Sequence, residues 1–316
     1  MKRFIIQIGV FLLLAGAFFP TAANPFKYNN LEVLPEALPV TSPEEESLRS
    51  KIETQAKHLN EKADNAKIDR VWKKMPGRNG LQVNIEESVN KMKKAGKFDK
   101  SLLVLEQVPP RIAFEDLPAA PIYRGHPEKE MVTLLINVSW GTENIPSMLK
   151  TLREKNVKAN FFIEGKWASQ NSDLVKMIQE EGHTIGNHAY NHPDMKRLAT
   201  AENREQIEKT NEIIKAITGE TPKWFAPPSG SYNEQVVQIA ADLEMETVLW
   251  SVDTIDWKNP TVPVMLKRVE EKVHPGAMIL MHPTDVVNSG LAELIDMIKR
   301  KGYKIAAIER LLSEQR

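Results

Sequence analysis

From residue 131 to the C-terminus, short apolar runs alternate with longer amphipathic runs, and this alternation constrains the fold more than any other feature of the chain. The apolar runs predict strands and the amphipathic runs predict helices. The predicted strands are residues 132–139, 160–163, 184–186, 223–226, 246–252, 277–281 and 304–306. The predicted helices are residues 145–155, 172–181, 200–218, 234–243, 262–273 and 290–301, with a further helix at the C-terminus. Repeated strand–helix units imply a parallel sheet, either open or closed into a barrel.

The first residues are typical of a segment that directs export. Lys2 and Arg3 precede an apolar run from Phe4 to Phe19, and small residues follow it. The run is short for a membrane-spanning helix, which needs roughly 20 apolar residues. Residues 1–23 are interpreted either as a cleaved signal peptide or as a retained N-terminal anchor. Both interpretations predict an exported protein that is extracellular, in the cell wall or on the outer face of the membrane.

The rest of the chain is expected to form three parts. Residues 24–65 predict a tether and then a charge-rich helix that begins near Pro43, with helical spacing of apolar residues continuing toward Trp72. Residues 66–130 predict a small α+β extension and a proline-rich linker, to which the sequence assigns no chemistry. Residues 131–316 form the predicted main domain.

Composition excludes several kinds of function. Lys and Arg number 42, Asp and Glu also number 42, and the formal net charge is zero. No bulk field therefore favours nucleic acid, and contact with a membrane is expected only through an uncleaved N-terminal segment. The absence of Cys excludes disulfides, thiolate metal sites and a cysteine nucleophile. The chain also lacks the glycine-rich signatures of nucleotide-binding sheets.

Polar residues gather directly after the predicted strands. They are Asn137, His188, His192, the Pro227–Gly230 segment, Asp253, Asp256 and His282. In parallel barrels the functional site forms at the carboxyl ends of the strands, so these side chains are expected at one rim. Two imidazoles four residues apart can turn toward one metal ion. The alternative for both histidines is a structural role in which they are held by hydrogen bonds.

Five segments, in this order along the chain, resemble motifs of the polysaccharide deacetylase family, the NodB-homology domain of carbohydrate esterase family four. They are Val157–Phe162 (V-K-A-T-F-F in the family), Asn187–His192 (H-[ST]-x-x-H), Trp224–Gly230 (R-x-P-Y-G), Trp250–Trp257 (D-x-x-D-W) and Gly276–His282 (L-x-H). The similarity covers roughly residues 131–312. It implies a distorted or incomplete (β/α) barrel of the TIM type for this part of the chain. The residues before it predict, by their own pattern, the small N-terminal α+β and helical extension.

The resemblance also implies a reaction, the metal-dependent hydrolysis of N-acetyl groups from N-acetylglucosamine-containing glycan such as peptidoglycan or a chitin-like polymer. The family's metal, usually zinc, is held by one Asp and two His. The two family histidines match His188 and His192. His282 matches the general acid, and Asp253 is expected to orient it. The same pair could equally be a buried structural pair that has outlived catalysis.

Two further residues are expected to contact the substrate. Trp257 and Pro228 are assigned to the sugar-binding groove, since aromatic faces suit the CH groups of sugars. Packing within the core is the alternative for Trp257. The family also includes members linked to sporulation in Gram-positive bacteria, although the motifs do not establish that role here.

The sequence departs from the family at the first catalytic motif, T-F-D-D-G. Counting back from Val157 without a gap, the general-base Asp becomes Asn137 and the metal-binding Asp becomes Val138. The partner Arg of the base becomes Ala226. A gapped alignment instead puts Ser139 and Trp140 on the two Asp positions, and it also leaves no carboxylate. An asparagine cannot take a proton at neutral pH and a valine cannot ligate a metal, so weak or lost activity and weakened metal binding are expected.

Three hypotheses follow for function. The first is an exported N-deacetylase that completes its metal site with a replacement ligand such as Glu143, Asp194 or Asp285. The second is a non-catalytic family member that binds glycan or a cell-envelope partner through the same rim. The third is a secreted scaffold with no groove function. Metal content separates the first hypothesis from the others, and glycan affinity separates the second from the third.

Overall fold

The computed structural model describes residues 42–316. The predicted export segment and the beginning of the tether lie outside the described residues. None of the helices in the described part is both long and apolar enough to cross a membrane. The described chain divides into two units. The smaller unit holds the residues up to Thr54 together with Ile85–Leu102, and the larger unit holds Gln55–Asn84 and Leu103–Arg316.

The smaller unit is built on helix α3 (Ile85–Ala95) and most of α2 (Pro43–Leu59). Both helices begin with acidic residues and end with basic ones, an arrangement that complements the helix dipole. Their buried apolar side chains include Ile52, Val89 and Met92. Two solvent-exposed ion pairs, Arg49–Glu86 and Lys93–Glu45, also link α2 with α3. Exposed pairs of this kind stabilise little, so the buried apolar residues carry the contact.

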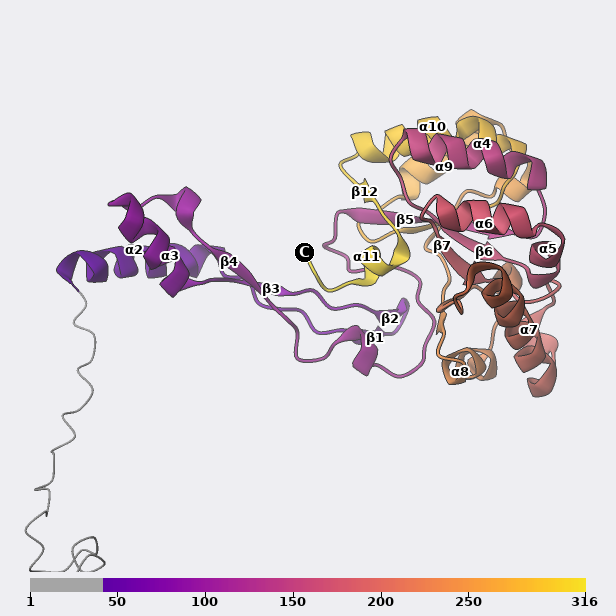
Figure 1. Cartoon of the computed structure of the whole chain (residues 1–316), viewed down its shortest axis with the longest axis horizontal. Coiled ribbons are helices and arrows are strands. Elements are labelled where there is room, and N and C mark those ends of the chain that lie inside the picture. The colour runs from indigo at the N-terminus through magenta and orange to yellow at the C-terminus, as the bar shows by residue number, and fades with distance from the viewer. Residues whose placement is uncertain (1–41) are drawn as a thin grey trace, which may run out of the picture. The chain divides into compact units, whose positions relative to one another are not determined.

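The larger unit contains a sheet of eight strands, and every strand pair in it is parallel. Figure 1 labels four of these strands, β5, β6, β7 and β12. The strands are β5 (Met131–Val138), β6 (Asn160–Ile163), β7 (Thr184–Asn187), β8 (Trp224–Phe225), β9 (Glu246–Thr247), β10 (Val252–Asp253), β11 (Met278–Met281) and β12 (Lys304–Ile305). Their order is β10-β11-β5-β6-β7-β8-β9, with β12 also paired to β5.

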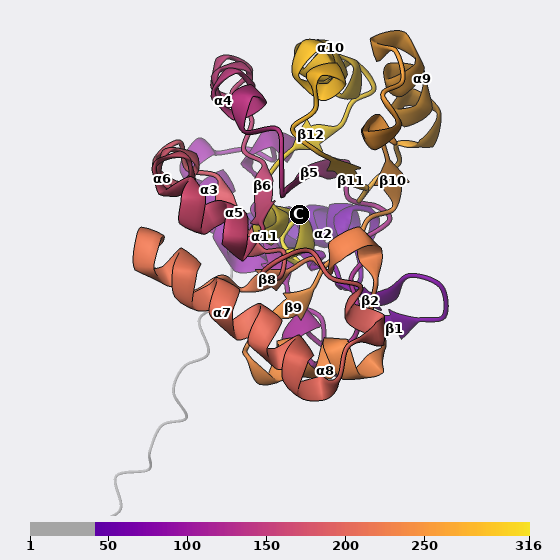
Figure 2. The same cartoon turned by 90° about the vertical axis from the view of Figure 1, so that its right-hand side faces the viewer.

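Helices stand around the outside of this curled sheet (Figure 2). They are α4 (Ile145–Glu154), α5 (Gly165–Gln170), α6 (Ser172–Glu180), α7 (Thr200–Thr218), α8 (Glu234–Asp242), α9 (Val262–Lys272) and α10 (Asp285–Arg300), followed in the chain by the short α11 (Ile308–Leu312). The predicted alternation of strands and helices is confirmed, as is the predicted α/β fold of a distorted, incomplete barrel.

Strand β5 shows why its sequence is apolar almost throughout. All eight of its residues are buried, because side chains alternate between two covered faces. Val132, Leu134, Ile136 and Val138 join the core between the sheet and the outer helices. Leu135 faces the inside of the curl, in a cluster with Ile308 and other apolar residues of α11. Helix α11 therefore fills the interior of the barrel at one end.

The sheet is not closed by a ninth strand between β9 and β10. An extended segment bridges this gap instead. Ile122 N donates to Thr247 O at 2.9 Å, and Leu249 N donates to Ile122 O at 2.8 Å. On the other side, Gly125 N donates to Gly276 O at 2.8 Å. The segment before the first barrel strand is therefore part of the barrel wall.

Some boundaries differ from those predicted. The predicted strand 246–252 is two strands, β9 and β10. They are separate because β9 pairs with β8 on one side of the gap in the barrel, whereas β10 pairs with β11 on the other side. Helix α10 begins at Asp285 rather than near residue 290, since Thr284 Oγ1 accepts from Val287 N at 3.3 Å and caps the helix. Helix α5 was not predicted at all, since its six residues are too few to show helical periodicity.

The segment before residue 131 also differs. The charge-rich helix ends at Leu59 and does not continue toward Trp72. The residues that follow it form two small antiparallel pairs, β1 (Lys67–Asp69) with β2 (Lys73–Met75), and β3 (Gly80–Val83) with β4 (Leu105–Val108). The predicted 66–130 extension is divided between the two units of the chain. Apolar residues are too few in these three- and four-residue strands for their spacing to predict where each strand begins and ends.

We expect Asn160→Leu to lower the free energy of unfolding by about 3 kcal/mol, because it removes a buried amide that ties β6 to two neighbours. Asn160 Nδ2 donates to Thr133 Oγ1 at 2.7 Å and to Leu134 O at 2.8 Å, and its Oδ1 accepts from Ile308 N at 2.9 Å. Denaturant unfolding measures the change. The exposed Asn191→Leu is the control and should change stability by less than about 0.5 kcal/mol; equal losses in both variants would contradict the assignment.

Candidate functional site

A cavity of about 370 Å³ opens at the carboxyl ends of the barrel strands. Its lining residues lie at or just beyond the ends of β5, β7, β8, β10 and β11. Aromatic side chains from the loops complete the lining. These are Asn137, Trp140, His188, His192, Ser229, Trp250, Asp253, Trp257, Leu280 and His282. Six residues that the sequence singled out as site candidates therefore meet in one hollow. Val138, Pro228 and Ala226 do not line it.

His188 lies directly after β7 and is almost completely buried. Its Nδ1 is 2.7 Å from the carbonyl oxygen of Ala226. A carbonyl oxygen can only accept, so Nδ1 carries the proton and Nε2 keeps a free lone pair. Burial, the nearby His192 and then His282 lower the pKa of His188 to about 3, partly opposed by the Ala226 hydrogen bond. The ring is therefore a neutral nitrogen donor throughout the physiological pH range.

His192 provides a second nitrogen donor beside the first. The ring centroids of His188 and His192 lie 5.2 Å apart in an edge-to-face arrangement. Burial lowers the pKa of His192 below its ordinary value, as does the nearby His282, while a backbone hydrogen bond acts in the opposite direction. The backbone of His192 is left-handed, with φ of 57°. The tight turn through Asn191 and His192 thus brings the fourth residue after His188 back toward it.

The donor set around these histidines does not make a complete metal site. Nowhere among residues 42–316 do three or more His, Cys, Asp or Glu side chains converge to hold a metal ion. His188 and His192 contribute two donors, whereas zinc sites in proteins use three or four protein ligands. The residues present therefore do not fit a resident zinc ion.

The expected replacement ligands are occupied elsewhere or remote from the pair. Asp194 accepts from a serine hydroxyl and pairs with an arginine, and Asp285 accepts from an asparagine amide. Glu143 does not line the cavity. Glu164, which the sequence did not single out, lies one residue beyond β6. Burial raises the pKa of Glu164, and the Ser139 hydroxyl acts in the opposite direction. None of these carboxylates forms a group of three with the histidines.

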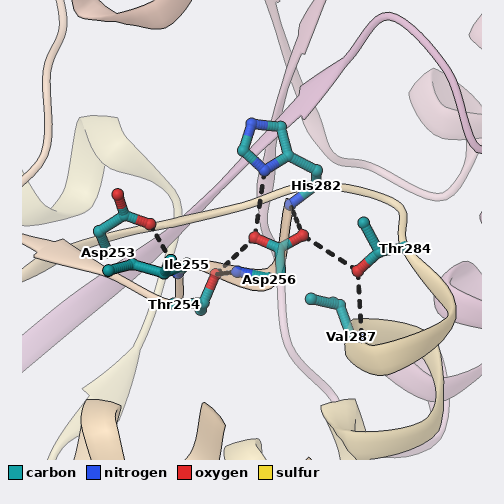
Figure 3. Close-up of polar contacts among 7 residues, drawn as sticks. All are labelled: Asp253, Thr254, Ile255, Asp256, His282, Thr284 and Val287. Carbon is teal, nitrogen blue, oxygen red and sulfur yellow. Dashed lines mark hydrogen bonds and ion pairs between the residues drawn. The ribbon is translucent and has the colours of Figure 1, made fainter. Parts of the chain in front are cut away.

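His282 is held by a buried carboxylate, and Figure 3 shows that this carboxylate belongs to Asp256. Asp256 Oδ1 lies 3.1 Å from His282 Nδ1 and accepts from Thr254 Oγ1 at 2.6 Å. Its Oδ2 accepts from Thr284 Oγ1 at 3.0 Å and from His282 N at 3.2 Å. Burial acts to raise the pKa of Asp256, but the bonds from His282 and the two threonines outweigh it, so the pKa lies below its usual range.

The expected role of Asp253 is therefore corrected. Asp253 Oδ1 accepts from Ile255 N at 2.8 Å, which uses the carboxylate to stabilise the turn (Figure 3). Asp253 remains half-exposed and lines the cavity. The second Asp of the D-x-x-D-W segment holds the histidine because the left-handed backbone at Ile255, with φ of 53°, reverses the chain toward β11. The spacing of Asp253 and Asp256 in the sequence does not show this reversal, so it could not tell which of the two carboxylates contacts His282.

Tryptophan side chains form much of the cavity wall. Trp140 stacks on the His282 ring, with centroids 5.1 Å apart and ring planes 16° apart. Trp257 has half of its surface exposed, so the alternative of core packing does not describe it. Pro228 is buried behind the wall, and the next residue, Ser229, lines the cavity in its place. Trp250 also lines the cavity, although the sequence, where it belongs to the Trp250–Trp257 segment, did not indicate it as a lining residue.

The parallel register of β5, β6 and β7 determines which residue of the first motif lies level with His188. Val138 pairs with Ile163, and Ile163 pairs with Asn187. His188 N donates to Ile163 O at 3.0 Å, one residue further on. His188 is therefore level with Ser139, and Val138 is one step below it.

Side-chain direction separates these residues further. Val138 points into the core beneath the outer helices, away from the cavity. Asn137 points inward, and its Oδ1 is buried without a hydrogen-bond partner among the described residues. Gly141 has φ of 73°, and a Cβ there would overlap the carbonyl oxygen of Pro283. Only glycine fits at this position, three residues after the end of β5.

Comparisons with known proteins agree with this geometry. A family model described as polysaccharide deacetylase matches residues 124–248. The uncharacterised protein YlxY of Bacillus subtilis is 46% identical over 316 residues, which is 100% of this chain and 99% of that one. The crystal structure of a CE4 family pseudoenzyme from Bacillus anthracis superimposes with a TM-score of 0.79 at 49% identity, covering 85% of this chain and 96% of the other. The chain belongs to the polysaccharide deacetylase family.

Within this family the chain also resembles proteins named as enzymes. A peptidoglycan-N-acetylglucosamine deacetylase of Bacillus cereus is 35% identical over 191 residues, covering 59% of this chain and 70% of that one. A mutant of the Bacillus anthracis pseudoenzyme is described as having restored enzymatic activity. Family membership is thus compatible with both an active and an inactive site.

We expect Asp256→Asn to lower the free energy of unfolding by about 3 kcal/mol at neutral pH, because it breaks a buried charged network. The pKa of Asp256 is lowered in the folded state, so its stabilisation is present above the ordinary carboxyl pKa of about 4 and is lost as the pH falls through the folded-state pKa. The difference between the variant and the unaltered chain should therefore shrink in acid. Denaturant unfolding over a pH series measures it.

Asp253→Asn is the matched control for this prediction. Its single backbone hydrogen bond can be kept by the amide oxygen, so a loss of less than about 1 kcal/mol is expected. A larger loss for Asp253→Asn than for Asp256→Asn would show that the wrong carboxylate has been assigned to His282.

Proposed function

We propose that this chain is an exported, non-catalytic polysaccharide deacetylase-like protein that binds N-acetylglucosamine-containing peptidoglycan through the rim cavity. One observation carries the proposal: the cavity is formed, yet among residues 42–316 no third His, Cys, Asp or Glu joins His188 and His192 in a group that could hold a metal ion. The names of the relatives support the choice of polymer, since enzymes of the family from several bacteria are peptidoglycan deacetylases.

The loss of catalysis is assigned to Ser139 and Trp140. These two residues take the positions of the family's adjacent aspartates when the motif's glycine is aligned with Gly141. Support comes from the register, which makes His188 level with Ser139, and from the left-handed backbone of Gly141. The ungapped alternative would put the metal-binding aspartate at Val138, whose side chain points into the outer core. A carboxylate there could not reach His188.

The cavity retains what is needed to bind a sugar. Trp257 and Trp140 have 50% and 44% of their surfaces exposed, which leaves aromatic faces for the CH groups of a sugar ring. Asn137 adds a buried carboxamide whose oxygen has no partner within the described residues, and such a group can accept from an N–H or hydroxyl of the ligand. Sites of this kind combine an apolar wall with a few fixed polar groups.

Export rests on residues 1–23, which act as a signal peptide or an anchor. Their charged start, apolar run and small residues support this assignment. A protein that binds peptidoglycan has to leave the cytoplasm, so the location and the ligand agree. Fractionation of cells that express the full chain tests the location.

We expect the unaltered full chain to release no acetate from N-acetylglucosamine oligomers or peptidoglycan when zinc is added. Ser139→Asp/Trp140→Asp should gain measurable release, because it returns two carboxylates level with the histidines, and adding Ala226→Arg should increase it by holding the base ionised. The matched comparison is Asn137→Asp/Val138→Asp, with and without Ala226→Arg, which should stay inactive. Acetate assay and zinc content measure the outcome.

Two results would contradict this assignment. Acetate release by the unaltered chain that disappears in His188→Ala would show that the protein is an enzyme with ligands not identified above. Release by the Asn137/Val138 variants, without release by the Ser139/Trp140 variants, would show that the ungapped register is right. Circular dichroism of each variant distinguishes a failed rescue from a failed fold.

Glycan binding itself should depend on the exposed tryptophan. We expect Trp257→Ala to weaken the binding of N-acetylglucosamine oligomers about fivefold, since an aromatic face contributes on the order of 1 kcal/mol. Titration calorimetry with the full chain measures this. Val264→Ala removes an exposed apolar side chain of α9 outside the cavity and should leave affinity unchanged. Absence of any binding by the unaltered chain would favour the scaffold hypothesis.

A further inference from the structure

A second and larger cavity lies at the opposite end of the barrel from the rim. Its volume is about 890 Å³, and it is bounded by the starts of β5 and β12, by α11 and by the loop after β2. Because parallel strands all run the same way, the starts of the strands and the rim are separated by the length of the sheet. Nothing in the proposed rim function uses this second cavity.

The cavity is strongly basic although the chain as a whole is neutral. Six cationic side chains line it: Arg78, Lys129, Lys299, Lys304, Arg310 and Arg316. The carboxylates that line it come from two glutamates. Over the whole chain the basic and acidic residues are equal in number, at 42 each. The excess of positive charge is therefore local to this cavity.

Few of these cations are neutralised within the protein. Arg78 pairs with Glu128, and Arg316 pairs with Glu61 at 2.5 Å. The remaining four have no carboxylate within 4.0 Å among residues 42–316. A cluster of unpaired cations in a concave surface focuses a positive potential into the hollow.

Lys129 shows that the cluster is part of the built structure. Only 8% of the residue is exposed, and its Nζ donates to the carbonyl oxygens of Arg310 at 2.7 Å and Ser313 at 2.5 Å. These carbonyls belong to the last turn of α11 and the residue that follows it, so they fix the ammonium without neutralising its charge. Burial, and then the charges of Arg310 and Arg78, lower the pKa of Lys129 to about 8, and the charge of Glu314 acts in the opposite direction. An anion bound in the cavity would stabilise a buried cation in this position.

We propose that this cavity binds the phosphate group of a phosphate ester. Lys129, Lys304 and Arg310 have no ion-pair partner among residues 42–316, and together they match the charge of a phosphate or of neighbouring phosphodiesters better than that of one carboxylate. Lys299 contributes less, because its Nζ donates to the carbonyl oxygen of Lys155 at 2.6 Å. Arginine offers a planar set of donors that suits phosphate oxygens, and lysine offers a point charge. The volume accommodates the alcohol portion of the ester as well as the phosphate. A wall polymer and a lipid headgroup both present this chemistry.

Two probes distinguish the sources. Calorimetry of the full chain with sn-glycerol 3-phosphate reports a soluble ester. Co-sedimentation with vesicles of phosphatidylcholine alone, or with added phosphatidylglycerol, reports a headgroup. We expect at least one probe to bind, with an affinity that falls as salt rises. The variant Lys304→Glu/Arg310→Glu should weaken that binding at least about twentyfold, since each lost charge accounts for roughly fivefold.

The matched control is Lys176→Glu/Lys215→Glu. These two lysines are exposed on α6 and α7 and lie outside the basic cavity, so the control changes net charge by the same amount. It should bind as the unaltered chain does. All versions keep residues 1–41, so any contribution of that segment to vesicle binding cancels between them.

Each outcome decides the proposal. Binding of the soluble ester that is lost in the cavity variant and kept in the control supports a site for a soluble phosphate ester. Vesicle binding with the same dependence supports a headgroup site. No binding of either probe, or equal binding by the cavity and control variants, overturns the proposal. Lys304 and Arg310 are exposed, so circular dichroism should show that their variant is folded. Lys129→Met then tests whether the buried ammonium contributes to binding, which should weaken in this variant.

Discussion

The parallel hydrogen-bond ladder of β11, β5, β6 and β7 is the constraint on which the site depends. Once Val138 pairs with Ile163 and Ile163 pairs with Asn187, the residues that leave each strand are fixed at one height. The side-chain alternation within β5 then decides which of them face the barrel interior. The cavity and the placing of the histidine pair beside the end of β5 both follow from this backbone register. A shift by one residue would turn Asn137 toward the helices and Val138 toward the cavity.

The rim keeps features that cost stability although its metal ligands are incomplete. His192, Ser229 and Ile255 have left-handed backbones, with φ of 57°, 53° and 53°. Such conformations cost about 1–3 kcal/mol each and are found at sites whose shape matters. The buried bond of Asp256 to His282 also survives. These features shape the cavity that the proposed binding of glycan would use.

The two ends of the barrel have different chemistry because different residues lie at the carboxyl ends and at the starts of the strands. At the rim the strands deliver imidazoles, an amide, the Asp253 carboxylate and tryptophan faces, which suit a sugar. At the other end the strands begin among lysines and arginines, which suit an anion. A protein with both sites could hold a glycan and a phosphate-bearing molecule of the envelope at the same time.

The sequence by itself determined the α/β class, most strand and helix positions, the family and the set of rim residues, because periodicity and ordered motifs are local signals. Asn137, His188, His192 and His282 could all be named from it as site candidates. It left two alignments of the first motif open, and it assigned His282 to Asp253 rather than Asp256. Tertiary structure decided the second point, since the partner of His282 depends on the left-handed turn at Ile255. On the first point, the pairing of β5 with β6 and of β6 with β7 supports the gapped alignment that we propose. The basic cavity was likewise invisible in the sequence, because its lysines and arginines come from distant segments that only folding brings together.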